Sequence, residues 1–248
     1  MNIIPIKTEK VSAGKCTLFS LLDAALSDMP EQSILAVTSK IISLTEGSVI
    51  PMETTDKETL IEQEAQLYIP PEKSKYDITL TITRDTLIPT AGIDESNGNG
   101  NYVLWPRDPE KSAREILDYL TRRFHRNKIG VLITDSKTTP LRLGTTGVSL
   151  AYAGFSALNN YIGEPDLFGR KLKVTKANVA DGLAASSVLV MGEGSEQTPI
   201  ALITDIPFIH FDPDAPTPTE TKELRIPLSL DIYAPLITGV SWKKGKGK

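Results

Sequence analysis

The sequence is poor in several residue types, and each shortage excludes a class of function. Cys16 is the only cysteine among 248 residues, which excludes an internal disulfide and a metal site built from several cysteines. Such cysteine usage fits a reducing compartment. Basic residues do not outnumber acidic ones, since the formal charge is -4 and the pI is near 5.4. Without a global positive charge, we expect no nucleic-acid partner.

Long apolar runs are also missing. No stretch approaches the ~20 consecutive apolar residues that a membrane span requires. Residues 1–15 lack the apolar core of a signal peptide. We therefore predict a soluble, cytoplasmic protein without a membrane partner.

Common catalytic signatures are absent as well. The two histidines, His125 and His210, have no partner pattern that indicates nucleophilic catalysis. The sequence contains neither a G-x-S-x-G elbow nor the GxxxxGK[ST] spacing of a P-loop. No Walker-type nucleotide site is therefore predicted.

What is present is a mixture of helix and strand patterns. The chain is 40% apolar, enough for a real core, and its length allows one large domain or two small ones. Apolar residues at helical spacing, several with capping residues ahead of them, predict helices over residues 17–29, 57–68 and 108–126, and from Thr175 or Asn178 through Val188.

Apolar and β-branched runs predict strands over residues 34–42, 77–89 and 129–136. The first strand is expected to run into a turn or helix at SLTEG. In the second run, isoleucine and leucine alternate with threonine, which predicts one apolar and one wet face. Segment 212–225 is rich in Pro, Thr and Glu and predicts an exposed connection, with strands after it. The KKGKGK terminus predicts a solvated tail.

Three acidic residues stand where backbone groups are accessible. Asp94 lies in the glycine-rich run GIDESNGNG, Asp135 ends an apolar strand, and Glu193 lies in a second glycine-rich loop, MGEGSEQTP. Hard divalent cations such as magnesium bind a few carboxylates, and water and substrate phosphates complete their coordination. Three such acids from separate loops could therefore form a cation and phosphate site.

Neighbouring groups could complete this site. Ser136 could add a hydroxyl ligand, and Asn97 could donate to a ligand oxygen. The MGEGSEQTP loop offers backbone N–H groups for an anion-binding nest, and Arg142 could hold a carboxylate or phosphate. From spacing alone the alternative stays open: each acid caps or turns its own segment, and Arg142 forms a surface ion pair.

A set of motifs carries a resemblance to a known family. Seven segments, in order over about residues 3–210, resemble the coenzyme F-420:gamma-glutamyl ligase family: SKIISLTEG, GIDESN, WPRDPEKSA, VLITDS, RLGTTGVSLAYAG, DLFGRKLKVTKANVADGLAASS and MGEGSEQTP. Each motif is weak alone, whereas the set is specific. Enzymes of this family use GTP to join L-glutamate to a phospholactate-bearing deazaflavin precursor.

The resemblance implies an architecture and a site. It implies an α+β fold of antiparallel sheets and helices, used as an intertwined homodimer. It also implies two divalent cations per subunit, Mg²⁺ or Mn²⁺, with K⁺ as a further candidate. Asp94 and Asp135 would bind one cation, and Ser136 and Glu193 the other. Nucleotide contacts would come from Ser39, Lys40, Asn97, Met191, Gly192, Gly194, Ser195 and Glu196, with a weaker match at residues 9–12.

The implied chemistry is amide formation through an acyl phosphate. GTP or ATP would phosphorylate the carboxylate of a small-molecule acid acceptor, and the amino group of L-glutamate would then displace phosphate. We assign catalytic roles to Asp94, Asp135 and Arg142. Residues 1–211 would form the catalytic domain, 212–243 a linker and C-terminal strands that complete the same fold, and 244–248 a disordered basic tail.

Two departures from the family pattern concern charge and acceptor. Leu44 stands where the family commonly has lysine, in S-K-A-E-G, so a phosphate-neutralising charge is missing or Lys40 replaces it. Ala151 and Tyr152 alter the family's V-A-I-G-x-A-G stretch, which would reshape the acceptor pocket if that stretch borders it. A folate-type acceptor is therefore one alternative. Alternatives from other classes are a metal-dependent phosphohydrolase and a non-catalytic nucleotide-binding protein.

Overall fold

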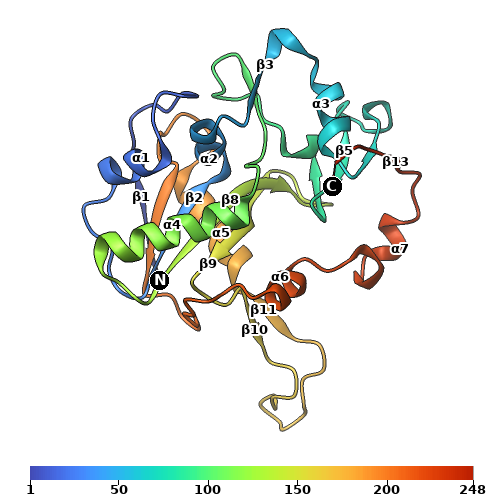
Figure 1. The fold of residues 1–248 in the computed structure, drawn as a ribbon. Helices are drawn as coiled ribbons and strands as arrows, with labels where there is room; N and C mark the ends of the chain where they lie inside the picture. The colour runs from blue at the N-terminus through green and yellow to red at the C-terminus, as the bar shows by residue number, and fades with distance from the viewer. Residues whose placement is uncertain (248) are drawn as a thin grey trace.

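A five-stranded sheet forms the centre of the computed structural model, which describes residues 1–247 (Figure 1). Its strand order is β1-β12-β2-β8-β9, in which β2 and β8 are parallel and the other neighbours antiparallel. The strands are β1 (Asn2–Ile6), β2 (Ser33–Thr38), β8 (Ile129–Thr138), β9 (Thr145–Ala153) and β12 (Ile200–Thr204). The predicted α+β class is confirmed, with one parallel pair where only antiparallel pairing was expected.

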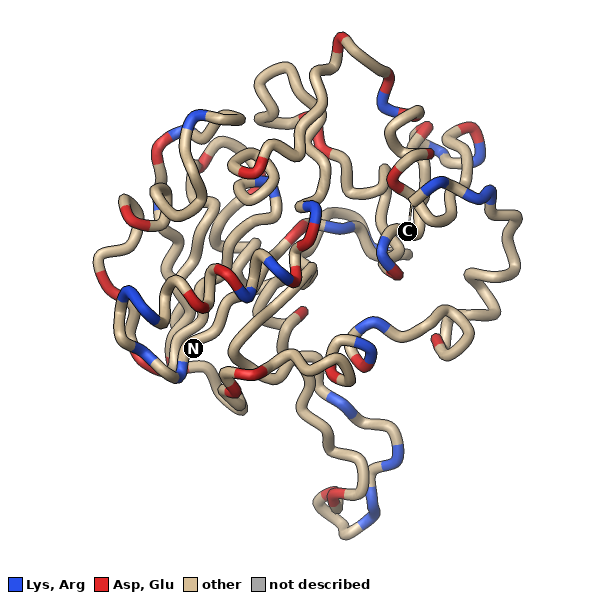
Figure 2. Tube along the Cα trace, viewed as in Figure 1, with Lys and Arg blue, Asp and Glu red and all other residues tan. Residues whose placement is uncertain are grey.

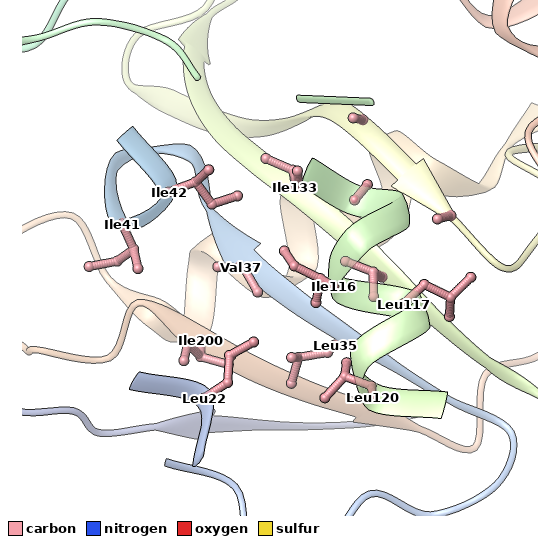
Figure 3. Close-up of a cluster of buried hydrophobic side chains, with 14 of the residues drawn as sticks. Leu22, Leu35, Val37, Ile41, Ile42, Ile116, Leu117, Leu120, Ile133 and Ile200 are labelled. Carbon is pink, nitrogen blue, oxygen red and sulfur yellow. The ribbon is translucent and has the colours of Figure 1, made fainter. Parts of the chain in front are cut away.

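Helices cover both faces of this sheet because its central strand is apolar on both sides. In β2, Leu35 and Val37 join the core cluster beneath α4, whereas Ile34 and Ala36 join the cluster beneath α5. Figure 3 shows the first cluster packed between α4 and the sheet. The helices are α1 (Leu18–Ala25), α2 (Ser39–Glu46) and α4 (Pro109–Phe124) on the first side, and α5 (Val179–Met191) on the second.

A second, smaller sheet has the strand order β13-β4-β5-β6. Helix α3 (Lys57–Glu64) precedes β4 in the chain, and β3 and β7 form a separate two-stranded sheet. Strands β10 and β11 form the base of an arm that leaves the body, with basic residues spaced along it (Figure 2). The strands are β3 (Val49–Pro51), β4 (Leu67–Ile69), β5 (Leu80–Thr83), β6 (Thr86–Pro89), β7 (Asn101–Val103), β10 (Leu158–Asn160), β11 (Lys176–Asn178) and β13 (Lys243–Lys244).

Side-chain caps fix where the main helices begin. Thr17, Asp56, Asp108 and Asn178 each accept a hydrogen bond from a backbone N–H in the first turn of the following helix. Such caps satisfy donors that have no partner within the helix. Asn178 therefore caps α5, which decides between the two starts that the sequence allowed.

Two strand predictions were partly wrong. The strand predicted over 34–42 ends at Thr38, because the chain turns into α2 at Ser39. The run 77–89 is a hairpin of β5 and β6 whose turn residues, Arg84 and Asp85, have positive φ. Likewise, the helix predicted over 57–68 ends at Glu64, before β4.

In β5 the threonine side chains are buried and a leucine side chain is exposed, which is the reverse of the usual pattern. Thr81 is fully buried, whereas Leu80 is 39% exposed. The Thr81 hydroxyl donates to the carbonyl of Ile88 and accepts the N–H of Ala91. The threonine face is therefore buried because local backbone groups satisfy its hydroxyl.

The C-terminal region differs from its prediction. The expected connection 212–225 contains α6 (Pro218–Leu224), which begins with a capping box between Thr217 and Glu220. The expected strands are replaced by α7 (Ala234–Ile237) and the short β13. The tail is not free up to residue 247, because its backbone N–H groups donate to carbonyls at the end of α3. Lys248 lies outside the described residues.

Within residues 1–247, no helix combines the length and apolar character needed to cross a membrane.

Candidate functional site

A cavity of about 790 Å³ opens where the parallel strands β2 and β8 reach their carboxyl ends. Thr38 and Ser39 line it from the end of β2, and residues 134–138 line it from β8. Ligands commonly bind beyond the carboxyl ends of parallel strands, where the chain leaves the sheet in different directions. The volume lies in the range of small-molecule sites.

The cavity brings together acids that are far apart in sequence. Asp94, Asp135 and Glu193 all line it, although they come from three separate segments. The other predicted cation and nucleotide residues line the same cavity, as does the 9–12 stretch: Ser39, Lys40, Asn97, Ser136, Met191, Gly192, Gly194, Ser195 and Glu196. The arrangement therefore goes beyond each acid serving only its own segment.

Two predicted features lie elsewhere. Arg142 is exposed in the loop between β8 and β9 and does not line the cavity, so the structure does not place it beside the other candidates. Tyr152 is buried within β9, with its ring 5.3 Å from that of Phe155. Neither Ala151 nor Tyr152 lines the cavity. The departure at these two residues therefore concerns core packing and not the wall of this pocket.

One end of the cavity is organised by an ion pair. The Lys40 ammonium, at the start of α2, lies 2.5 Å from the Asp94 carboxylate. It also donates to the hydroxyl and carbonyl oxygens of Ser96 at 3.0 and 3.1 Å. Burial raises the pKa of Asp94, but the contacts from Lys40 and Ser96 outweigh it and leave this pKa below its ordinary value. Asp94 is therefore anionic near neutral pH.

Asp135 lies in a different environment. A register shift in the pairing of β8 with β9, between Ile133 and Thr134, immediately precedes it, and such irregularities re-aim side chains at the ends of sheets. The indole N–H of Trp105 donates to its carboxylate. Burial is the largest effect and raises the pKa of Asp135 to about 6, and the negative charge of Asp94 adds to it.

The other end of the cavity is built from hydroxyls and a loop. Ser136 and Thr145 donate to the Glu193 carboxylate at 2.7 and 3.3 Å. The Asn97 amide donates to the carbonyl of Gly194 at 3.1 Å, which joins the two glycine-rich loops. The N–H of Gly194 already donates to the Glu196 side chain at 2.8 Å. This N–H group is therefore not free to serve an anion-binding nest.

The donor set suits a hard divalent cation. The lining side chains offer carboxylate and hydroxyl oxygens and include no histidine or cysteine, which favours Mg²⁺ or Mn²⁺ over softer metals. In residues 1–247, no three acidic, histidine or cysteine side chains gather closely enough to hold one ion together. A cation here would have one or two carboxylates, with water and phosphate as its other ligands, as is usual for Mg²⁺. The Lys40 ammonium against Asp94 shows that this position attracts positive charge.

Comparisons with known proteins identify the family of this chain. The sequence model of the family described as F420-0:Gamma-glutamyl ligase matches residues 5–205. The chain belongs to this family. The coenzyme F420:L-glutamate ligase of Methanothermobacter thermautotrophicus is 32% identical over 236 residues, covering 87% of this chain and 90% of that protein. The ligase of the same name from Methanopyrus kandleri is 31% identical over 223 residues, covering 82% and 86%. The resemblance and the amide-forming ligase class are therefore confirmed.

Sequence reasoning missed several residues in or beside this cavity. Lys57 lines it and pairs with Glu95 at 2.7 Å, and no motif marked it. Trp105 stands in the quoted WPRDPEKSA motif, but the motif alone suggested no contact with Asp135. Leu44 also lines the cavity, one helical turn after Lys40 on α2. The absent family lysine would thus have lain in this same cavity.

Proposed function

We propose that the chain is a GTP-dependent γ-glutamyl ligase that adds L-glutamate to a deazaflavin acceptor of the F420-0 type, in the cytoplasm. The observation that carries the proposal is the meeting of Asp94, Asp135 and Glu193 with a glycine-rich loop in one cavity. Family membership supports the reaction class, and the names of the relatives support the acceptor.

The nucleoside triphosphate would lie beside the acids and the two lysines of the cavity. Lys40 and Lys57 both line the cavity and supply positive charge for phosphate oxygens. A phosphate that approaches Lys40 competes with Asp94 for the ammonium. Because Leu44 carries no charge, we assign the neutralising role of the family lysine to Lys40.

The acids would hold the divalent cations. Asp94 and Asp135 would bind one, and Ser136 and Glu193 the other. Bound there, the cations would neutralise charge on the transferring phosphoryl group and align the attacking and leaving oxygens. Asp94 has a lowered pKa and is ready to bind a cation near neutral pH, whereas Asp135 must first lose its proton at about pH 6.

The reaction itself would run in two displacements. An acceptor carboxylate oxygen attacks the γ-phosphorus, and the nucleoside diphosphate leaves. The amino group of L-glutamate then attacks the acyl carbon, phosphate leaves, and the amine proton passes to solvent. Water must be excluded, because the acyl phosphate would otherwise hydrolyse. The apolar part of the cavity wall can do this: Val11, Ile41, Leu44, Ile78, Ile88, Ile93 and Val188.

We also propose that the protein acts as a homodimer. Leu167 is 98% exposed, Phe168 95% and Val174 85%, all on the arm between β10 and β11. An exposed group of large apolar side chains favours contact with another protein surface. Light scattering during size-exclusion chromatography should give twice the chain mass, and Leu167→Asp with Phe168→Asp should reduce it to the chain mass.

A single assay set tests the ligase proposal against its alternatives. Purified protein is incubated with Mg²⁺ or Mn²⁺, GTP or ATP, L-glutamate and either a deazaflavin or a folate acceptor, and the products are weighed by mass spectrometry. A ligase adds one glutamyl unit and releases phosphate only when glutamate and acceptor are both present. Phosphate release without glutamate would indicate a phosphohydrolase, and nucleotide binding without turnover a binding protein. Either result contradicts the proposal.

Substitutions connect this assay to the cavity. Asp94→Ala should abolish the mass gain. Arg142→Ala provides the matched control, because it also removes a charged residue of the chain but lies outside the cavity. Full activity of the Asp94→Ala variant would refute the site assignment.

A further inference from the structure

The end of β7 and the residues just after it contact both Asp94 and Asp135. The backbone of Val103 exchanges two hydrogen bonds with that of Asp94, N–H of Asp94 to O at 3.0 Å and N–H of Val103 to O at 2.8 Å. Two residues later, the Trp105 indole N–H donates to the Asp135 carboxylate. One short piece of backbone therefore sets where both acids lie relative to each other.

Gly92 leaves room for the indole ring at its N–H edge. Trp105 is only 8% exposed and belongs to the main core cluster. A Cβ on Gly92 would overlap the pyrrole edge of the indole, at and beside its N–H. Gly92 also has a φ of +74°, which side chains other than glycine rarely adopt. The glycine that opens GIDESN therefore makes room for the ring that reaches Asp135.

An N–H donor on one carboxylate oxygen fixes the direction of the other oxygen. Groups that hydrogen-bond a metal ligand in this way orient it and commonly affect metal affinity about 10- to 100-fold. A ring that served packing alone would not need a donor at this atom. A phenylalanine at position 105 could fill much of the same space without holding Asp135.

We propose that Trp105 is a positioning residue. It orients the Asp135 carboxylate toward a divalent cation and keeps that carboxylate at a fixed position relative to Asp94. This role rests on the proposed cation site. Trp105 does not line the cavity, so it acts through Asp135. Gly92 contributes to this positioning, because it provides the space in which the indole lies.

The sharpest test removes only the donor. In a Trp242→Phe background, Trp105 is replaced by 3-benzothienylalanine, whose sulfur takes the place of the indole N–H while the ring shape is kept. Binding of Mn²⁺, without nucleotide or acceptor, is measured by titration calorimetry and by loss of the electron paramagnetic resonance signal of free Mn²⁺. We expect about 10- to 100-fold weaker Mn²⁺ binding. The melting temperature in the absence of Mn²⁺ should fall only modestly, because one hydrogen bond is lost while the packing of the core is kept.

Fluorescence gives an independent readout, since the chain has two tryptophans. In the Trp242→Phe variant, Mn²⁺ should quench the remaining Trp105 emission saturably, because the ion binds next to the indole. In the Trp105→Phe variant, Trp242 should show no saturable quenching. Trp242 donates to the carbonyl of Ile237 in the C-terminal region and does not line the cavity.

The outcomes separate this inference from the ligase proposal. Mn²⁺ that binds the Trp242→Phe protein equally well with and without the N–H would overturn the role of Trp105 and leave the ligase proposal intact. A wild-type protein that binds no Mn²⁺ would overturn the cation site and this role together. Gly92→Ala should weaken Mn²⁺ binding as the removal of the Trp105 N–H does. Unchanged Mn²⁺ binding by the Gly92→Ala variant would also contradict the positioning role of Trp105.

Discussion

The two ends of the cavity are built in different ways from adjacent residues. Asp135 and Ser136 are neighbours on β8, where successive side chains point to opposite sides. Asp135 contacts Trp105 from the core, whereas Ser136 contacts Glu193 in an exposed loop. The Asp135 end is thus held by buried structure, and the Glu193 end by an exposed loop.

The largest expected effect separates the two ends directly. Asp135→Asn should lower ligase turnover at least about 100-fold, because a cation supplies several kcal/mol of transition-state stabilisation. Glu193→Gln should cost only about 10-fold, since water can replace an exposed ligand of Mg²⁺. Steady-state kinetics with saturating GTP measure both. Equal losses would remove the distinction between the ends.

Stability provides the control for this pair. The raised pKa of Asp135 means that its charged form is disfavoured by burial. Asp135→Asn should therefore unfold at the same or a higher temperature than wild type near pH 8. A large drop in melting temperature would show that the loss of activity came from misfolding.

The next effect compares the two lysines of the cavity. Lys40→Met removes the charge paired with Asp94 at 2.5 Å, and we expect the KM for GTP to rise about tenfold, in line with a hydrogen bond to a charged group. Lys57→Met is the matched change at the pair with Glu95 and should raise it less, because Glu95 does not line the cavity. A larger effect at Lys57 would place the phosphates nearer to α3.

A smaller effect should appear in the pH dependence. The pKa of Asp135 is about 6 in the folded chain, above its ordinary value of 3.8. The folded state then binds more protons than the unfolded state between these values, so this group makes the cation-free protein less stable as pH rises from about 4 to about 6. The lowered pKa of Asp94 has the opposite sign, but its stabilising effect is lost only below pH 3.8.

Cation binding reverses this trend, because it requires the deprotonated carboxylate. The increase in melting temperature caused by Mn²⁺ should therefore grow as pH rises through about 6. Calorimetric scans with and without Mn²⁺ measure it. In Asp135→Asn, the increase in melting temperature caused by Mn²⁺ should depend less on pH. A wild-type increase in melting temperature that did not change with pH would argue against Asp135 as a ligand.

The smallest expected effect is none. Arg142→Ala should change kcat/KM for GTP less than about twofold, since surface substitutions away from a site have little influence. A tenfold loss would indicate that the β8–β9 loop reaches a substrate.

The sequence was informative where local chemistry decides structure. The caps at Thr17, Asp108 and Asn178 and the apolar stripes between them located the helices, and glycine-rich runs pointed to two of the loops that line the cavity. The sequence was less informative where contacts between distant residues determine which side chains are buried. The threonine face of β5 is buried because of contacts with Ile88 and Ala91, and the period of the strand cannot show which face is covered.

The same limit applies to the site. Residues that resemble family motifs could be named in advance, because their order along the chain carries the signal. The indole of Trp105 meets Asp135 only through the fold, thirty positions apart. Arg142 was predicted from its residue type alone, and the hairpin of β8 and β9 carries it away from the cavity. Side-chain partners across such distances need coordinates.

The attachment of the C-terminal residues to α3 has a practical consequence for purification. The N–H groups of Gly245, Lys246 and Gly247 donate to carbonyls in the last turn of this helix and just after it at 2.9–3.0 Å. A Cβ on either glycine would overlap backbone there. Helix α3 begins with Lys57. An affinity tag fused behind this segment would lie close to the helix that supplies a cavity lysine. A tag is therefore better placed before Met1, which is 53% exposed.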